Sequence, residues 1–299
     1  MSKIPKLLHF CFTSNEDLGG KPWSLVHYVC VRSAVERLRP ERAYIYFEFE
    51  PVGPWWEISR PFLTLRRIRL PTEVFGHSLR HPAHIADVVR LQKLLECGGI
   101  YLDVDVFVHS SFDDLLENSV VLGEEGAGGK GGLGNAVILA EPNALFLRKW
   151  HDEYRSFRPE GWNEHSIQKP GELARKFPND VTVLPHDNFY SPDWTPAGLQ
   201  MLYGNGPALE SRTTRANHLW ESLAWEKYLE DLTPGRVRKI ESNFHSWVRP
   251  LLSELPDNFG QLRLHKRITK KLRKGARSLE LMPGRVAAKL RNKLRGTRG

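Results

Sequence analysis

The sequence lacks the features that would place it among membrane-spanning, secreted or disulfide-stabilised proteins. It has no apolar run of about 18 residues, the length that a transmembrane helix requires. Its first residues, Met1 to Pro5, lack the layout of a signal peptide. Cysteine is scarce, and Cys11, Cys30 and Cys97 show no Cys-x-x-Cys spacing. We therefore expect reduced, buried thiols in a cytoplasmic protein, without a disulfide framework or a zinc site.

What the sequence does contain is enough apolar side chain for one large domain, followed by a strongly basic end. The chain has 299 residues, of which 40% are hydrophobic, so it can bury a full core. Residues 261–299 carry 14 of the 43 lysines and arginines but one of the 35 acids, which gives +13 there and −5 over residues 1–260. We predict a folded domain over 1–260 and a basic tail over 261–299.

The tail has the pattern of a basic amphipathic helix. Apolar residues recur at helical spacing among its lysines and arginines, with a break at Pro283-Gly284; they are Ile268, Leu272, Ala276, Leu279, Val286, Leu290 and Leu294. Such a helix can lie on an anionic membrane surface, which is the partner we favour. Two alternatives remain: a phosphate backbone, bound without sequence specificity, or no partner other than solvent.

Strand-like and helical segments alternate along residues 1–190, which favours a mainly parallel sheet flanked by helices. Helical patterns lie near Leu25–Leu38, Ala83–Glu96 and Asn143–Phe157. The predicted strands are Leu7–Phe12, Ala43–Phe49, Leu65–Leu70, Ile100–Asp103, Val120–Leu122, Ala136–Leu139 and Val181–Leu184. In such sheets ligands bind at the carboxyl ends of the strands. The segment after Ser191 is rich in loop residues, Trp and Pro, and we expect it to form acceptor and lid surfaces.

The segment from Ala86 to Asp105 is the most informative part of the chain. Asp87 and Arg90 are three residues apart and share one face of the predicted helix. Gly98-Gly99 ends that helix, and a short apolar strand follows. Asp103 and Asp105 come at the end of this strand with i, i+2 spacing, so in an extended strand they point the same way. Two parallel carboxylates repel each other unless a cation lies between them, and hard oxygen ligands favour Mg²⁺, Mn²⁺ or Ca²⁺.

A divalent cation at this point would suit the departure of a diphosphate from a nucleotide-sugar, because it stabilises the growing negative charge. Each element has an ordinary explanation when taken alone. An Asp-x-Asp pair is common in solvated turns, and Asp87–Arg90 could be a surface ion pair worth under about 1 kcal/mol. The order and spacing of all the elements together favour the functional interpretation.

The segment resembles the signature of glycosyltransferase family 32, whose sugar-binding region contains a DXD motif. The matching residues are Asp87-x-x-Arg90 and Gly98-Gly99-Ile100-Tyr101-Leu102-Asp103-x-Asp105. The opening Ile4–His9, the turn Asn205-Gly206-Pro207 and the element His218–Trp225 also resemble the family's pattern, in the expected order. The family usually has Trp where Phe12 stands and an aromatic residue where Leu91 stands.

The resemblance implies a GT-A type, Rossmann-like fold and a retaining hexosyltransferase that uses Mn²⁺ or Mg²⁺ in capsule, exopolysaccharide or lipopolysaccharide synthesis. Its partners would be a nucleotide-sugar donor, a glycan or lipid-linked glycan acceptor and the inner face of the membrane, with no specific nucleic acid. We expect Asp87, Arg90, Asp103 and Asp105 to be catalytic and Asp103, Asp105 and His218 to bind the metal. The expected donor-binding residues are His9, Phe12, Asp87, Arg90, Asp103, Asn135 and Trp225.

Two other classes of protein share parts of the pattern. Leu102–Val106 resembles the first motif of haloacid-dehalogenase-like phosphatases, but the strand Val181–Leu184 leads into a segment without the second paired acid of that class. A metal-dependent sugar-binding module would share the carboxylates and leave Asp87–Arg90 unexplained. The run Gly129–Gly134 fits the dinucleotide pattern G-x-G-x-x-G, yet a strand pattern follows it where a helix is needed, so we expect a loop beside the donor site. Glu124 and Glu125 are expected in solvated loop.

Overall fold

The computed structural model describes residues 2–14, 21–126, 131–206, 208–209 and 213–261. The predicted basic tail and its amphipathic helix therefore lie outside the described residues, except for Gln261. Gly129 and Lys130 of the glycine-rich run also lie outside them, whereas Leu133 and Gly134 begin a strand. Residues 1–260 form one compact unit.

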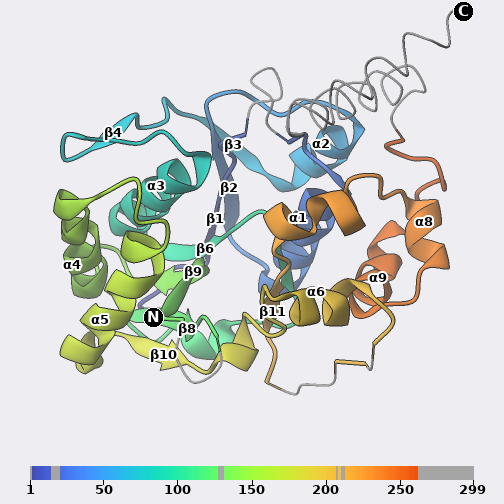
Figure 1. Ribbon diagram of the computed structural model, residues 1–299. Helices are drawn as coiled ribbons and strands as arrows, with labels where there is room; N and C mark the ends of the chain where they lie inside the picture. The colour runs from blue at the N-terminus through green and yellow to red at the C-terminus, as the bar shows by residue number, and fades with distance from the viewer. Residues whose placement is uncertain (1, 15–20, 127–130, 207, 210–212, 262–299) are drawn as a thin grey trace, which may run out of the picture. The chain divides into compact units, whose positions relative to one another are not determined.

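A seven-stranded sheet is the centre of this unit, with the strand order β10-β8-β9-β6-β1-β2-β3 (Figure 1). Strand β9 is antiparallel to both of its neighbours, and the other neighbouring pairs are parallel. The strands are β1 (Leu7–Cys11), β2 (Arg42–Phe47), β3 (Thr64–Arg67), β6 (Gly99–Leu102), β8 (Val120–Glu124), β9 (Leu133–Ala140) and β10 (Thr182–Leu184). The mainly parallel sheet predicted from the sequence is confirmed.

Side chains alternate between the two faces of the sheet, so each face has its own apolar core. On one face Leu8, Phe10 and Ile100 pack in a cluster that includes the buried side of α1 (Leu25–Leu38). On the other face Tyr46 and Tyr101 pack with α3 (Pro82–Cys97) and α4 (Leu145–Glu153). The thiols Cys11 and Cys30 are buried as expected; Cys97, at the end of α3, is partly exposed, which corrects the prediction.

Further short elements connect and flank these layers. The remaining α-helices are α2 (Pro54–Ser59) and α5 (Lys169–Lys176), with α6 (Pro196–Tyr203), α7 (Glu221–Ala224), α8 (Pro234–Lys239) and α9 (Asn243–Val248) after Ser191. Two two-stranded sheets pair β4 (Glu73–Val74) with β5 (His77–Ser78) and β7 (Val106–Val108) with β11 (Ala216–His218). The 3₁₀ and π helices are η2 (Arg60–Phe62), η3 (Asp113–Leu115), η5 (Tyr154–Ser156), η6 (Glu164–Gln168), η7 (Pro178–Asp180), η8 (His186–Asn188), η9 (Trp225–Leu229) and η10 (Arg249–Leu252).

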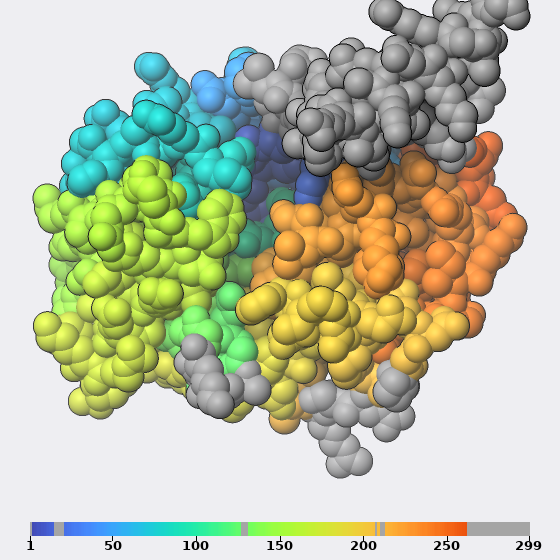
Figure 2. Space-filling model, viewed as in Figure 1, coloured from blue at the N-terminus to red at the C-terminus, as the bar shows by residue number. Residues whose placement is uncertain are grey.

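The segment after Ser191 is more helical than its composition suggested. The four α-helices among the described residues of this segment are only four to eight residues long, so no amphipathic period is long enough to reveal them in the sequence. In the space-filling view a groove separates the yellow-green surface over α4 and α5 from the orange surface of the C-terminal helices, with blue and teal parts of the chain at its floor (Figure 2). Among the described helices, none combines the length and apolar composition needed to cross a membrane.

Candidate active site

The helix α3 and the strand β6 position the acidic motif through two glycines. Gly98 ends α3 with a φ of 64°, and its N–H donates to the carbonyl of Leu94. Gly99 begins β6 with a φ of 114°, and a Cβ there would lie 2.5 Å from the carbonyl oxygen of Leu7 on β1. Only glycine fits both the backbone conformation and this close approach. The sharp reversal of the chain at these two glycines lets α3 pack against the sheet that contains β6.

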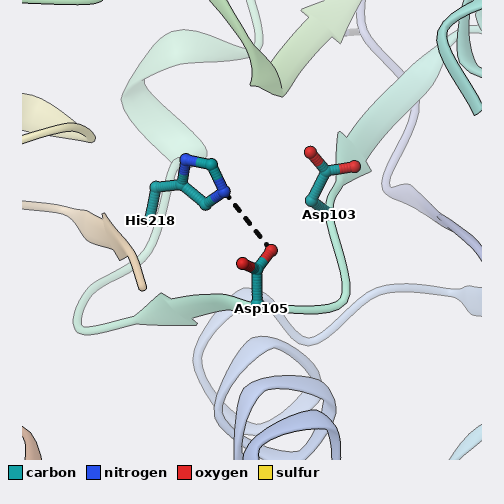
Figure 3. A group of neighbouring side chains, drawn as sticks. All are labelled: Asp103, Asp105 and His218. Atoms are coloured by element: carbon teal, nitrogen blue, oxygen red, sulfur yellow. Dashed lines mark ion pairs between the residues drawn. The ribbon is translucent and has the colours of Figure 1, made fainter. Parts of the chain in front are cut away.

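Asp103, Asp105 and His218 converge at the end of β6 (Figure 3). One ligand atom from each lies within 4.8 Å of the others, and His218 Nε2 is 3.4 Å from Asp105 Oδ1. The two aspartates are not in a strand, as the i, i+2 argument assumed, because β6 ends at Leu102. They lie in a turn before β7, where the N–H of Val106 donates to the carbonyl of Asp103. His218 comes from β11, which pairs with β7.

Backbone groups of the C-terminal segment fix Asp105. Its Oδ2 accepts a 2.8 Å hydrogen bond from the N–H of Glu221, and its carbonyl accepts one from Leu219. Burial acts to raise the pKa of Asp105, but His218, the N–H of Glu221 and His27 outweigh it and hold the pKa below its usual value. Asp105 is therefore a permanently charged carboxylate near neutral pH.

The surroundings of His218 favour positive charge. Burial acts to lower its pKa, yet Asp105, Asp103 and Glu125 together raise it. A group that attracts a proton in this way also attracts a cation, which would displace that proton. Its Nδ1 is buried and has no hydrogen-bond partner among the described residues.

Arg90 connects the helix to the acidic turn from a buried position, with 4% of its side chain exposed. Its Nε donates to the carbonyl of Ala86 and its Nη1 to the carbonyl of Asn135 and to Asp103 Oδ2. Its Nη2 forms ion pairs with Asp87 Oδ1 at 3.3 Å and Asp103 Oδ1 at 3.1 Å. The guanidinium also lies 4.6 Å from the ring centroid of Tyr101. Asp87–Arg90 is thus not a surface ion pair. Arg90 orients Asp103. The expected contact of Arg90 with the donor stays a prediction.

Asp87 and Asn135 meet beside this arginine. Asn135 Nδ2 donates to Asp87 Oδ1 at 2.7 Å, while no described residue donates to Asp87 Oδ2. Burial raises the pKa of Asp87 to about 6, although Arg90 and Asn135 favour its charged form. The structure therefore brings together six of the predicted site residues, namely Asp87, Arg90, Asp103, Asp105, Asn135 and His218.

The residue types in the cluster fit a divalent cation. Two carboxylates and one imidazole form a hard, mixed oxygen and nitrogen donor set. Arg90 and Tyr101 use three of the roughly four lone-pair positions of Asp103, which leaves one at Oδ2 for a metal. The hydrogen bond from Tyr101 and the contacts from Arg90 would fix the orientation of this ligand.

Three other predicted site residues are placed differently. His9 is fully buried; its Nε2 donates to the carbonyl of Gly98, and its Nδ1 is hydrogen-bonded to Tyr46. Phe12 packs edge-on against Trp23 and His27, and Trp225 is 8% exposed. The structure does not bring His9 into the cluster, and its contacts are those of a core residue.

Five residues in or near the cluster were missed by the sequence analysis or expected elsewhere. Tyr101 donates to Asp103, and Glu221 accepts an ion-pair contact from Lys21. Glu125 follows β8, is half-buried and helps to raise the pKa of His218. Glu124 is the last residue of β8. Neither residue lies in a solvated loop, where they were expected. For Glu221 a signal existed: it lies three residues after His218 in the family-like element. Lys21 had none, since its contact spans 200 residues of sequence.

Comparison with known proteins gives a consistent result. The family model described as "Glycosyltransferase sugar-binding region containing DXD motif" matches residues 60–122, which include α3, β6 and both aspartates. "Glucan organizing enzyme 1" of Cryptococcus neoformans var. grubii is 36% identical over 265 residues, covering 85% of this chain and 72% of that protein.

Two solved structures with related folds were also found. The PaToxG glycosyltransferase covers 58% of this chain and 70% of its own, with 15% identity and a TM-score of 0.43. The galactosyltransferase LgtC, in complex with donor and acceptor sugar analogs, covers 87% of this chain and 99% of its own, with 14% identity and a TM-score of 0.39.

The match to a relative over most of that relative's length, together with the family model at the acidic turn, defines the class of enzyme. The chain belongs to the glycosyltransferases whose sugar-binding region contains a DXD motif. It has their GT-A arrangement, a mainly parallel sheet with the Asp-x-Asp turn after a central strand, and it transfers a sugar from a nucleotide-sugar donor to a glycan acceptor. The phosphatase and the sugar-binding module are set aside.

Proposed function

We propose that this glycosyltransferase depends on a divalent metal, Mn²⁺ in the first place, bound by Asp103, Asp105 and His218. The observation that carries the proposal is the convergence of these three side chains from two separate segments, the turn between β6 and β7 and the strand β11. Imidazole favours Mn²⁺ over Mg²⁺, for which all-oxygen sites are usual. When bound, the ion would supply Lewis-acid stabilisation of the leaving diphosphate.

The donor sugar would lie beside Asp87 and Asn135. Asp87 Oδ2 is the carboxylate oxygen that no described residue uses, so it can accept a hydrogen bond from a sugar hydroxyl. Asn135 orients Asp87 through the other oxygen. Arg90 forms ion pairs with both Asp87 and Asp103, so it holds the proposed sugar-binding residue Asp87 in a fixed position relative to the proposed metal ligand Asp103. A hexose has hydroxyl groups around its ring that can donate hydrogen bonds to Asp87.

We further propose that the transfer retains the anomeric configuration by a same-face displacement. In this proposal Asp103 and Asp105 hold the metal and Asp87 Oδ2 accepts a hydrogen bond from the donor sugar, so none of the three aspartates is assigned as a nucleophile. In a same-face reaction the leaving diphosphate takes up the acceptor's proton, and the protein supplies positioning and charge stabilisation.

The similarity to a protein named as a glucan organizing enzyme supports a role in surface polysaccharide synthesis with a glycan or glycolipid acceptor. A screen of nucleotide-sugars for slow hydrolysis, with and without added Mn²⁺, tests the donor and the metal together. We expect hydrolysis of one donor, dependent on Mn²⁺. Equal hydrolysis in the presence of a chelator would refute the metal dependence.

The basic segment 261–299 supports a second part of the proposal, a peripheral location at the inner face of the membrane. Its +13 charge and its apolar stripe suit an anionic surface, to which each Lys or Arg near the headgroups contributes up to about 1 kcal/mol. Removal of residues 261–299 should sharply reduce binding to vesicles that contain phosphatidylserine while donor hydrolysis is kept. Equal vesicle binding by both proteins would contradict this location.

A further inference from the structure

The carboxylate of Glu221 lies immediately beside the metal ligand Asp105. Glu221 is the first residue of α7, and its backbone N–H donates to Asp105 Oδ2 at 2.8 Å. Its side chain is 9% exposed and faces two basic residues. Lys21 Nζ lies 2.7 Å from Oε2, and His27 Nε2 lies 3.7 Å from Oε1. A buried carboxylate therefore directs a lysine toward the edge of the cluster.

His27 is a fixed and uncharged part of this arrangement. Burial lowers its pKa to about 4, so the ring is neutral near pH 7. Its Nδ1 accepts a hydrogen bond from the N–H of Ser24, which leaves the proton on Nε2, facing Glu221. The positive charge beside Glu221 therefore belongs to Lys21.

Lys21 differs from Arg90 in what it has left to offer a ligand. Arg90 is buried between Asp87 and Asp103, whereas the Lys21 side chain is 33% exposed. An ammonium group has three donors, and Glu221 takes one of them. The ammonium also lies 5.4 Å from the ring centroid of Trp225, and the Lys21 carbonyl accepts a hydrogen bond from Ser14. The ammonium group of Lys21 is therefore held in place by Glu221 and is still accessible to a ligand.

The reaction develops charge that such a group can stabilise. A diphosphate that leaves its sugar gains negative charge, and lysine binds phosphate well as a point charge. Lys21 can do so through the two N–H donors that Glu221 leaves free.

We propose that Lys21 is the cationic contact for the diphosphate of the donor and that Glu221 positions it. The inference rests on the proposed function. Lys21 keeps one N–H on Glu221 and directs the other two to phosphate oxygens, so the buried carboxylate is not left unpaired.

The chain contains a closely matched control. Lys93 Nζ lies 2.7 Å from Glu96 and 5.4 Å from the ring centroid of Tyr46, which are the two distances that Lys21 makes with Glu221 and Trp225. Lys93 belongs to α3, and its partner Glu96 is exposed. The comparison of Lys21→Ala with Lys93→Ala therefore separates phosphate binding from the loss of an ordinary lysine ion pair.

Calorimetric titration with inorganic pyrophosphate in the presence of Mn²⁺ tests the inference, because this probe has the two phosphates without base or sugar. We expect Lys21→Ala to weaken pyrophosphate binding about 10-fold or more, Glu221→Gln to weaken it less, and Lys93→Ala to leave it unchanged. Binding of Mn²⁺ alone should stay the same in Lys21→Ala, which also verifies folding. Equal pyrophosphate affinity of Lys21→Ala and Lys93→Ala, or no binding by the parent protein, would overturn the inference. The metal dependence of donor hydrolysis is measured separately, so its failure is distinguishable.

Discussion

His9 is fully buried and His218 is partly buried, and the surroundings of these two histidines of one domain are opposite. The contacts of His9 are complete: one ring nitrogen donates to Gly98, the other is bound to Tyr46, and burial lowers its pKa to about 4. His218 faces two aspartates that raise its pKa, and its Nδ1 has no partner among the described residues. A buried group with satisfied hydrogen bonds stabilises the fold, whereas excess charge of one sign indicates a place for a ligand.

The strongest test of this contrast removes the charge of Asp105 and keeps its shape. Asp105→Asn can still accept the hydrogen bond from Glu221, so the fold should persist. Metal-dependent donor hydrolysis should fall by about 1000-fold, equivalent to about 4 kcal/mol of transition-state stabilisation. Hydrolysis rates and Mn²⁺ titration measure the effect. Near-normal turnover with Mn²⁺ would show that the metal lies elsewhere.

A smaller effect is expected from the substitution Arg90→Lys. Lysine keeps the positive charge beside Asp103. Its ammonium group has fewer N–H donors than the guanidinium group and cannot make all of the contacts of Arg90, so Asp103 loses its fixed orientation. We expect the affinity for Mn²⁺ to fall about 10- to 100-fold, as is typical for a residue that orients a metal ligand. Arg215→Lys is the control, because Arg215 makes a two-point contact with the exposed Asp114 away from the cluster. Equal metal affinity in both variants would assign Arg90 a purely structural role.

His9→Phe should leave the affinity for Mn²⁺ unchanged and alter the dependence of stability on pH. The native pKa of about 4 lies below the unfolded value of 6.5, so the native state binds fewer protons between these values. Stability therefore falls as the pH falls from 6.5 to 4, by up to roughly 3 kcal/mol for one such histidine. Urea unfolding across this range should show a shallower pH dependence in His9→Phe. Other histidines with lowered pKa values contribute to the residual slope, among them His27 and His245, whose pKa values also lie at about 4. An unaltered slope would contradict this account of His9.

Local periodicity in the sequence predicted the strands of the large sheet and the shared helical face of Asp87 and Arg90, whereas the other site residues were predicted from motif spacing and family resemblance. Apolar runs between glycines and polar turns identified all seven strands of the large sheet, and Asp87-x-x-Arg90 was correctly placed on one face of α3. Periodicity could not show that β9 is antiparallel, because pairing direction depends on the path of the chain. Nor could periodicity show that Arg90 contacts Asp103 or that Lys21 reaches Glu221, since these two interactions join segments that are separate in the sequence.

The small sheet of β7 and β11 has a consequence for how the chain can change in length. Val106 is paired with His218, so a ladder of only three residue pairs delivers the imidazole to the aspartates. Segments can be inserted between the two strands without displacing the imidazole, provided that the ladder stays aligned. A single inserted residue next to either strand would shift the pairing and turn His218 to the opposite side of the ladder. Tolerance to insertion should therefore be higher in the loops between β7 and β11 than at residues 103–108 and 216–221, where it should be close to nil.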